Sequence, residues 1–319
     1  MATQWLRRAW LVGACALGLL TASCGGGDIV SQLDPSRIIS FGDAWADAGQ
    51  NGNAYTINQD SPTNNWTTYV ASGFGNQLTP SARGGLSYAI GNARVAAKPD
   101  AAGNNATLTV TEQIDAFLQS GNAPGSNDLV IVNAGTSDLI VHAKAAFDGT
   151  ETSEQAIAAM TVAGQALGAQ VRRLVSAGGK HVVVVGPYNM GSSPWSVETG
   201  QGSLLKSMSQ QFNEQMLVSI VDLGASVLYV DAAYYFNLVT ANPGNYDIVN
   251  AATPVCTSID PGPGIGTGAN QVNSNLCTAA TTVPGVDRTK YLFADRVYPT
   301  PRGQQLFGDF ALNKIRERW

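Results

Sequence analysis

The sequence predicts an α/β fold in three layers, a doubly wound and mostly parallel five-stranded sheet with helices on both faces. Strand and helix signals alternate along the chain. The runs that end at Val132 and Val185 are continuously apolar and rich in β-branched residues, which is typical of parallel strands buried on both faces. A chain of 319 residues is long enough to bury a sizeable core.

Local patterns place the elements in order. Strands are expected over 37–41, 86–90, 129–132, 181–185 and 226–230. Helices are expected over 111–118, 154–175, 202–222 and 302–317. The helix over 154–175 carries apolar residues at helical spacing, and Gly178-Gly179 stops it. No internal repeat or low-complexity run divides 35–319, so we expect one domain there.

Composition excludes one class of partner and favours export. The formal net charge is -5 and 13% of the residues are charged, so there is no basic stripe for nucleic acid. Low charge together with 35 glycines is typical of an exported protein. The first 23 residues support this, since Arg7 and Arg8 precede an apolar stretch over 11–20 and a small-residue cleavage site. That stretch is too short to span a bilayer.

Two fates remain open for the mature N-terminus. Thr21-Ala22-Ser23-Cys24 resembles a bacterial lipobox, which implies a lipidated Cys24 followed by a glycine-rich tether over 24–34. Gly25 after that cysteine resembles the outer-membrane class, so we expect a lipoprotein that faces the periplasm or the cell surface and contacts the membrane through its anchor. The alternative is a soluble secreted or periplasmic protein from which Cys24 has been trimmed.

The mature domain contains two further cysteines, Cys256 and Cys277, on either side of a Pro/Gly-rich segment. In an oxidising compartment two remaining thiols usually pair, so we expect a disulfide here. A metal site is disfavoured because the only histidines, His142 and His181, lack ligand spacing. We expect no cofactor and no metal.

The stretch from Ile38 to Gly49 reads as a core strand that ends in a functional loop, because the carboxyl ends of parallel strands are where ligands are held. It contains Phe41-Gly42-Asp43-Ala44 and Asp47-Ala48-Gly49, and it resembles the first signature block of the GDSL (SGNH) esterases and lipases, Phe-Gly-Asp-Ser-Leu-Ser-Asp-x-Gly. Ala44 stands at the position of the family's serine nucleophile. The resemblance extends over nearly all of 35–319, to the lipase-like bacterial branch, and implies the flavodoxin-like SGNH-hydrolase fold.

The family's chemistry also needs an oxyanion hole, formed by the nucleophile's N–H, a second-block glycine N–H and a third-block asparagine side chain. The second block is Tyr88-Ala89-Ile90-Gly91-Asn92, so the resemblance implies Gly91 or Asn92 as the backbone donor. The third block has Ser137 where the family has asparagine. A hydroxyl is shorter than an amide, so this donor is weakened or lost.

The fifth block should carry the catalytic base as Asp-x-x-His-Pro, and here it has Asp295, Tyr298 and Pro299. A tyrosine side chain ordinarily has a pKa near 10 and is protonated at neutral pH, so Tyr298 cannot replace a histidine whose pKa is near 6.5. We expect a structural corner in which Asp295 accepts a hydrogen bond from the Tyr298 hydroxyl or pairs with Arg296.

Other polar residues near these blocks have mostly structural interpretations. His142 follows Asp138 by one helical turn and is a candidate base, although a histidine on an apolar flank is more often a packing or surface residue. His181 begins a core strand and is expected to be structural. The resemblance implies that Asp43 and Asp47 hold their loop through hydrogen bonds to backbone groups.

Two functions from different classes follow. The first is a non-catalytic relative of the ester hydrolases that binds an acyl ester, a glycan or a protein partner. The second is a weak or rewired carboxylic ester hydrolase that uses the residual oxyanion hole. Trp45, Trp66 and Tyr88 would place aromatic area near the old site and suit an acyl chain or a sugar face. Alternatively, Trp45 fills space that the lost chemistry no longer needs.

Overall fold

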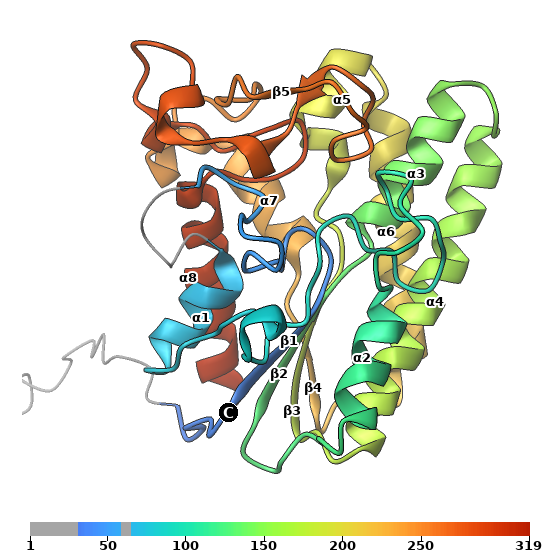
Figure 1. Cartoon of the computed structure of the whole chain (residues 1–319), viewed down its shortest axis with the longest axis vertical. Coiled ribbons are helices and arrows are strands. Elements are labelled where there is room, and N and C mark those ends of the chain that lie inside the picture. Colours follow the sequence, from blue (N-terminus) through green and yellow to red (C-terminus); the bar gives the residue numbers. More distant parts are fainter. Residues whose placement is uncertain (1–30, 59–64) are drawn as a thin grey trace, which may run out of the picture. The chain divides into compact units, whose positions relative to one another are not determined.

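A computed structural model describes residues 31–58 and 65–319 of the chain (Figure 1). The predicted signal peptide and the lipidation residue Cys24 lie outside the described residues, and both stay predictions. None of the helices in the described part of the chain is long and apolar enough to cross a bilayer.

A four-stranded parallel sheet in the order β1-β2-β3-β4 forms the centre of the domain. Its strands are β1 (Ile38–Gly42), β2 (Leu129–Asn133), β3 (His181–Val185) and β4 (Val227–Tyr229). In register, Ile38 lies beside Leu129, and Leu129 lies beside His181. Every residue of β1 and β2 is buried, as the continuous apolar runs predict. The α/β fold class is confirmed.

The sheet has four strands and not the predicted five, because residues 86–90 do not form a regular strand. This segment runs beside β1, where the N–H groups of Ser40 and Tyr88 bond to the carbonyls of Leu86 and Ser40. It follows β1 to its end, where the Ile90 N–H donates to the Gly42 carbonyl at 3.1 Å, but it forms only isolated bridges, at Ser87. Its place outside β1 still gives the strand order of a flavodoxin-like sheet.

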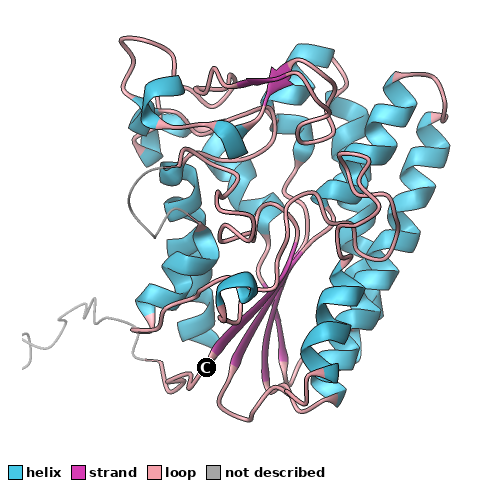
Figure 2. Ribbon diagram, viewed as in Figure 1, coloured by secondary structure: helices cyan, strands magenta, loops and turns pink. Residues whose placement is uncertain are grey.

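Helices cover both faces of the sheet, as Figures 1 and 2 show. The helices α1 (Trp66–Gly73) and α8 (Pro301–Arg318) pack together on one face, with α7 (Ala232–Ala241) against α8. The other face carries α2 (Val110–Gln119), α3 (Thr136–Phe147), α4 (Ser153–Ser176) and α6 (Gly202–Ser219). A short helix, α5 (Pro194–Thr199), precedes α6.

The four expected helices are present with ends shifted by at most three residues, and caps explain the starts of two. Thr109 and Glu112 form a capping box before α2, and Thr152 and Gln155 form one before α4. The sequence did not predict α1, α3, α5 or α7. These helices are short or follow a strand directly, and their apolar residues do not form a single stripe at helical spacing.

The described end of the expected tether belongs to the domain. Leu33 is buried, and the N–H groups of Gln32 and Leu33 donate to the carbonyl of Trp319 at 2.8 and 2.9 Å. Residues 31–34 therefore pack on the end of α8 instead of continuing a free tether.

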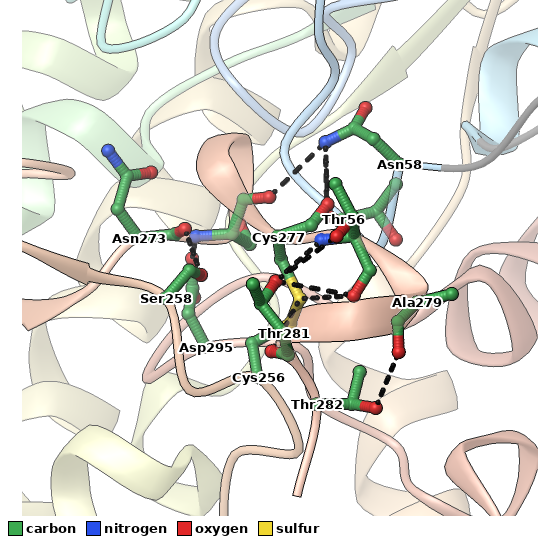
Figure 3. Close-up of a disulfide and its surroundings, with 12 residues drawn as sticks. Thr56, Asn58, Cys256, Ser258, Asn273, Cys277, Ala279, Thr281, Thr282 and Asp295 are labelled. Carbon is green, nitrogen blue, oxygen red and sulfur yellow. Dashed lines mark hydrogen bonds between the residues drawn. A yellow bond between two sulfur atoms is a disulfide. The ribbon is translucent and has the colours of Figure 1, made fainter.

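Cys256 and Cys277 form a disulfide, as predicted (Figure 3). It closes a segment that contains a small antiparallel pair, β5 (Ile259–Asp260) and β6 (Gln271–Val272). Both cysteines lie in a second small core with Ile57, Val255 and Ala294.

Removing this disulfide should lower stability. In the chain-entropy model a closed loop of this length stabilises the fold by about 3 kcal/mol, so we expect Cys256→Ala/Cys277→Ala to lose about that much unfolding free energy in urea. Alkylation of the purified protein without reductant should leave both cysteines unlabelled. Labelling of either one would contradict the pairing.

Candidate active site

The first-block turn is held from below by a glutamine. Gly42 ends β1, and its N–H donates to Gln113 Oε1 at 2.9 Å while Gln113 Nε2 donates to the Gly42 carbonyl at 3.0 Å. Gln113 is buried in α2. This reciprocal pair fixes the point at which the chain leaves the sheet and enters the turn that carries Ala44.

Asp43 ties this turn to the start of α3. Its carboxylate accepts hydrogen bonds from the N–H groups of Trp45, Thr136 and Ser137, at 3.1, 3.0 and 3.4 Å. The last two are among the free donors of the helix N-terminus, which favours an anion there. Burial nevertheless raises the pKa of Asp43 to about 7, and the backbone hydrogen bonds oppose that shift. The expected structural role of Asp43 agrees with these contacts.

Asp47 connects the first block to the second. It accepts hydrogen bonds from the N–H groups of Gly49, Gln50 and Gly91 at 2.8, 2.6 and 2.8 Å. Burial raises its pKa to about 6. Because the Gly91 N–H already donates to Asp47, it is not free to stabilise an oxyanion. Of the two second-block candidates, this leaves Asn92.

Asn92 has the backbone conformation that a glycine would favour, with φ of 64°. Its side-chain Nδ2 donates to the Gly264 carbonyl at 3.1 Å, and its Oδ1 is buried without a partner in the described chain. Neither the Asn92 N–H nor the Ala44 N–H has an acceptor among the described residues. The two backbone N–H groups that the resemblance implies as oxyanion donors therefore have no acceptor in residues 31–58 and 65–319.

The third-block position that the resemblance implies for an oxyanion donor lies at the start of α3. Ser137 is fully buried in the first turn of this helix. The next residue, Asp138, bonds to Arg94 Nε at 3.1 Å and to the Val95 N–H at 2.9 Å. Burial raises the pKa of Asp138, while Arg94 lowers it.

Both expected partners of Asp295 are wrong. Its carboxylate accepts hydrogen bonds from the backbone N–H groups of Val297 and Tyr298 at 2.8 and 2.7 Å, and from Ser274 at 3.1 Å. Arg296 pairs with Glu198 instead. The backbone turns tightly after Asp295, so the N–H groups of Val297 and Tyr298 bond to its carboxylate, and the Tyr298 hydroxyl does not. The segment is still a structural corner, because Asp295 holds it closed.

Tyr298 fills the position of the base. Its side chain is buried, and its ring lies 5.4 Å from that of Tyr55, centroid to centroid. Burial raises its pKa well above 10, and the nearby carboxylates of Asp43 and Asp295 raise it further. A phenol in this environment stays protonated and cannot accept a proton from a nucleophile.

The aromatic residues expected to line a cleft belong mainly to the core. Trp45 is buried against Tyr188, Phe236 and Phe307, and its Nε1 donates to Gln304 at 3.1 Å. Trp66 is equally buried. The alternative that Trp45 fills space is therefore the better description.

His142 is occupied on both ring nitrogens. Its Nε2 lies 3.0 Å from Arg94 Nη2, and its Nδ1 lies 3.0 Å from Glu151. Because the guanidinium can only donate, Nε2 must accept and Nδ1–H must donate to Glu151. His142 thus links two charged side chains at the surface of α3. His181 packs on Trp319 at the amino end of β3, as expected of a structural residue.

Tyr55 is a residue of this site that no sequence pattern indicates. It lies in a loop without a motif, yet it covers the second block: a Cβ added to Gly91 would lie 2.1 Å from the Tyr55 hydroxyl. The next residue, Thr56, ties this loop to the fifth block, because its hydroxyl donates to the Pro299 carbonyl at 2.9 Å. The one sequence feature that could have indicated this cover is Gly91, because a backbone that another side chain approaches this closely requires a glycine.

The site therefore brings together the positions that the resemblance implies and provides little chemistry there. Ala44, Ser137, Asp295 and Tyr298 are all buried, and Ala44 has no nucleophilic atom. No cluster of histidine, cysteine, aspartate and glutamate suited to a metal ion occurs in the described residues.

Comparison with known proteins agrees with the motifs. The family described as GDSL-like Lipase/Acylhydrolase matches residues 38–310. An uncharacterized protein of the trpE-trpG intergenic region of Pseudomonas putida is 24% identical over 310 residues, which are 89% of this chain and 49% of that protein. A GDSL esterase/lipase of Arabidopsis thaliana is 24% identical over 160 residues, 47% of this chain and 41% of that protein. The chain spans half the length of these curated relatives or less.

Solved structures of esterases are similar at low identity. The inhibitor-bound aryl esterase of M. smegmatis is 13% identical, with a TM-score of 0.46 over 89% of this chain and 99% of that chain. A carbohydrate acetylesterase family member from Sinorhizobium meliloti is 13% identical, with a TM-score of 0.40 over 88% of this chain and 98% of that chain.

Proposed function

We propose that this chain, which belongs to the GDSL-like lipase and acylhydrolase family, is a non-catalytic member that acts by binding. The observation that carries the proposal is the buried pair Ala44 and Tyr298, which replaces a nucleophile and a base by a methyl group and a protonated phenol. Loss of a triad lowers turnover by about 10⁶ in a well-studied serine protease, so little activity would remain.

Burial of the former site favours a partner that binds elsewhere on the surface. An acyl chain or glycan in the old cleft would have to displace Tyr298 and Tyr55, which pack on each other. Extraction of lipids and glycans from the purified protein tests this choice. A stoichiometric ligand would support the cleft, and bare protein would support a protein partner.

A weak ester hydrolase is the second candidate, and one observation favours it. The N–H groups of Ala44 and Asn92 have no acceptor among the described residues and could stabilise an oxyanion formed by direct attack of water. Such a path lacks a base, because Tyr298 stays protonated and His142 is held by Arg94 and Glu151.

We expect the unmodified protein to hydrolyse short p-nitrophenyl esters no faster than a heat-denatured sample. The measurement is the initial rate of nitrophenol release at neutral pH. Robust turnover that His142→Ala abolishes would overturn the non-catalytic proposal and establish the rewired hydrolase.

We also propose that the protein is an exported lipoprotein anchored through Cys24, as the lipobox-like sequence suggests. The mature protein should fractionate with membranes, and Cys24→Ala should release it or leave it unprocessed. If processing and membrane fractionation are unchanged in that variant, the anchor lies elsewhere or is absent.

A further inference from the structure

The disulfide-closed segment 256–277, here called the lid, contacts several blocks of the former active site. We propose that the lid is a locked cover that keeps the Ala44 position out of reach of small molecules. In Figure 1 the segment with β5 lies near the top of the view, beyond one end of the four-stranded sheet. Its contacts with the second and fifth blocks and with α3 carry the proposal.

Three hydrogen bonds join the lid to the second and fifth blocks. The Gly264 carbonyl accepts from Asn92 Nδ2 at 3.1 Å. The Ser274 N–H donates to Asp295 at 3.1 Å, and the Thr267 carbonyl accepts from Arg296 Nη1 at 3.4 Å. Each of these bonds therefore joins the lid to a residue of a signature block.

An apolar anchor fixes the same stretch of the lid. Ile265 is 1% exposed and lies in the main hydrophobic core. The backbone at Gly266 lies close to two other segments, since an added Cβ would be 2.3 Å from the Ala101 carbonyl and 3.0 Å from the Ile140 side chain. Ala101 bonds through its N–H to the Asn92 carbonyl of the second block, and Ile140 belongs to α3, which begins in the third block. Lifting the lid would expose Ile265 to water, which opposes opening.

The base of the lid is tied to the loop that carries Tyr55. The disulfide joins its ends, and the Asn58 N–H donates to the Cys277 carbonyl at 2.8 Å. Asn53 and Asn275 each donate a side-chain bond of 2.9 Å to the other's carbonyl. Figure 3 shows Asn58 and Asp295 among the residues around the disulfide. Both covering segments are thus held as one unit over the site.

The lid would keep reagents away from the Ala44 position. This effect is separate from the absence of catalytic groups at the site. Ala44 and Ser137 have no exposed surface, so a reagent can reach them only when the lid or the Tyr55 loop opens. A thiol placed at the Ala44 position reports this opening without any catalysis. If the lid proposal fails, the non-catalytic proposal still stands. If the non-catalytic proposal fails, the lid proposal still stands.

The test is the alkylation rate of an Ala44→Cys variant of the full chain, with iodoacetamide as the probe and the adduct located by peptide mass mapping. We expect slow alkylation in the native protein. Adding Ile265→Ala should raise the rate at least about tenfold, because it removes the lid's anchor. Ile259→Ala is the matched control, since Ile259 belongs to the same lid but is 55% exposed, and it should leave the rate unchanged.

Two further thiols separate lid opening from unfolding. Val249→Cys, at a residue that is 80% exposed, should react fast in every background. Ala71→Cys, buried in α1 away from the lid, should stay slow when Ile265→Ala is added. The lid is refuted if the thiol at position 44 reacts as fast as the Val249→Cys thiol in the otherwise unchanged protein. It is equally refuted if Ile265→Ala accelerates the thiols at positions 44 and 71 alike, or accelerates neither. Cys256→Ala/Cys277→Ala gives a second way to loosen the lid and should act like Ile265→Ala.

Discussion

In a protein whose lid is loosened by Ile265→Ala, replacing Ala44 by serine and Tyr298 by histidine together should raise the hydrolysis of short acyl esters at least about a hundredfold over that parent. The serine supplies a nucleophile on the turn that Asp43 holds, and the histidine supplies a base three residues after Asp295. The measurement is the rate of nitrophenol release by the double variant and by each single variant. Neither single variant should reach the double, because a hydroxyl without a base stays a poor nucleophile.

Two further changes to this variant probe the other barriers. Ser137→Asn should increase turnover further, by at most about a hundredfold to a thousandfold, by returning an oxyanion donor. Restoring Ile265 should lower turnover, because the anchored lid again limits access to position 44. If the double variant is folded, open to alkylating reagents and still inert, the site has been remodelled beyond its missing groups. Asn92 would then be the first residue to examine.

Stability should fall by about 4 kcal/mol between pH 5 and pH 8, because burial raises the pKa values of Asp43 and Asp47 to about 7 and about 6. In the unfolded chain these carboxyls titrate near 3.8. A group whose folded pKa is raised contributes stability that is fully present below its unfolded pKa and is lost as the pH rises through the folded pKa. Urea denaturation at both pH values measures the change.

A matched variant shows which carboxyl causes the change in unfolding free energy with pH. Asp43→Asn does not titrate, so it should lose the larger part of the pH dependence and keep the part that comes from Asp47. An unfolding free energy that stays level or rises from pH 5 to pH 8 would show that the backbone hydrogen bonds to Asp43 outweigh its burial.

Much of the sheet could be predicted from the sequence because parallel strands buried on both faces leave a plain signal. The runs ending at Val132 and Val185 correspond to β2 and β3 with little shift. The segment 86–90 contains Ser87 and Tyr88 and lacks such a continuous run, so its signal was weaker. It lies beside β1 and forms only isolated bridges there.

At the site, the sequence predicted identities better than contacts. The blocks placed Ala44, Ser137 and Tyr298 as substitutions for family residues, whereas the partners of Asp295 came out wrong because backbone N–H groups carry no sequence signal. The roles of Tyr55 and Ile265 could not be foreseen either. Both lie in loops, and their importance depends on how two distant segments pack over the blocks.

Whether this protein has lost its nucleophile is tested by its intact mass after exposure to an alkyl fluorophosphonate, measured beside the Ala44→Ser/Tyr298→His variant in which Ile265→Ala also loosens the lid. We expect no adduct on the unmodified protein, because Ala44 has no oxygen to phosphonylate, and one adduct on the variant, at position 44. A stoichiometric adduct on the unmodified protein, located to any serine of the chain, would contradict the loss of the nucleophile.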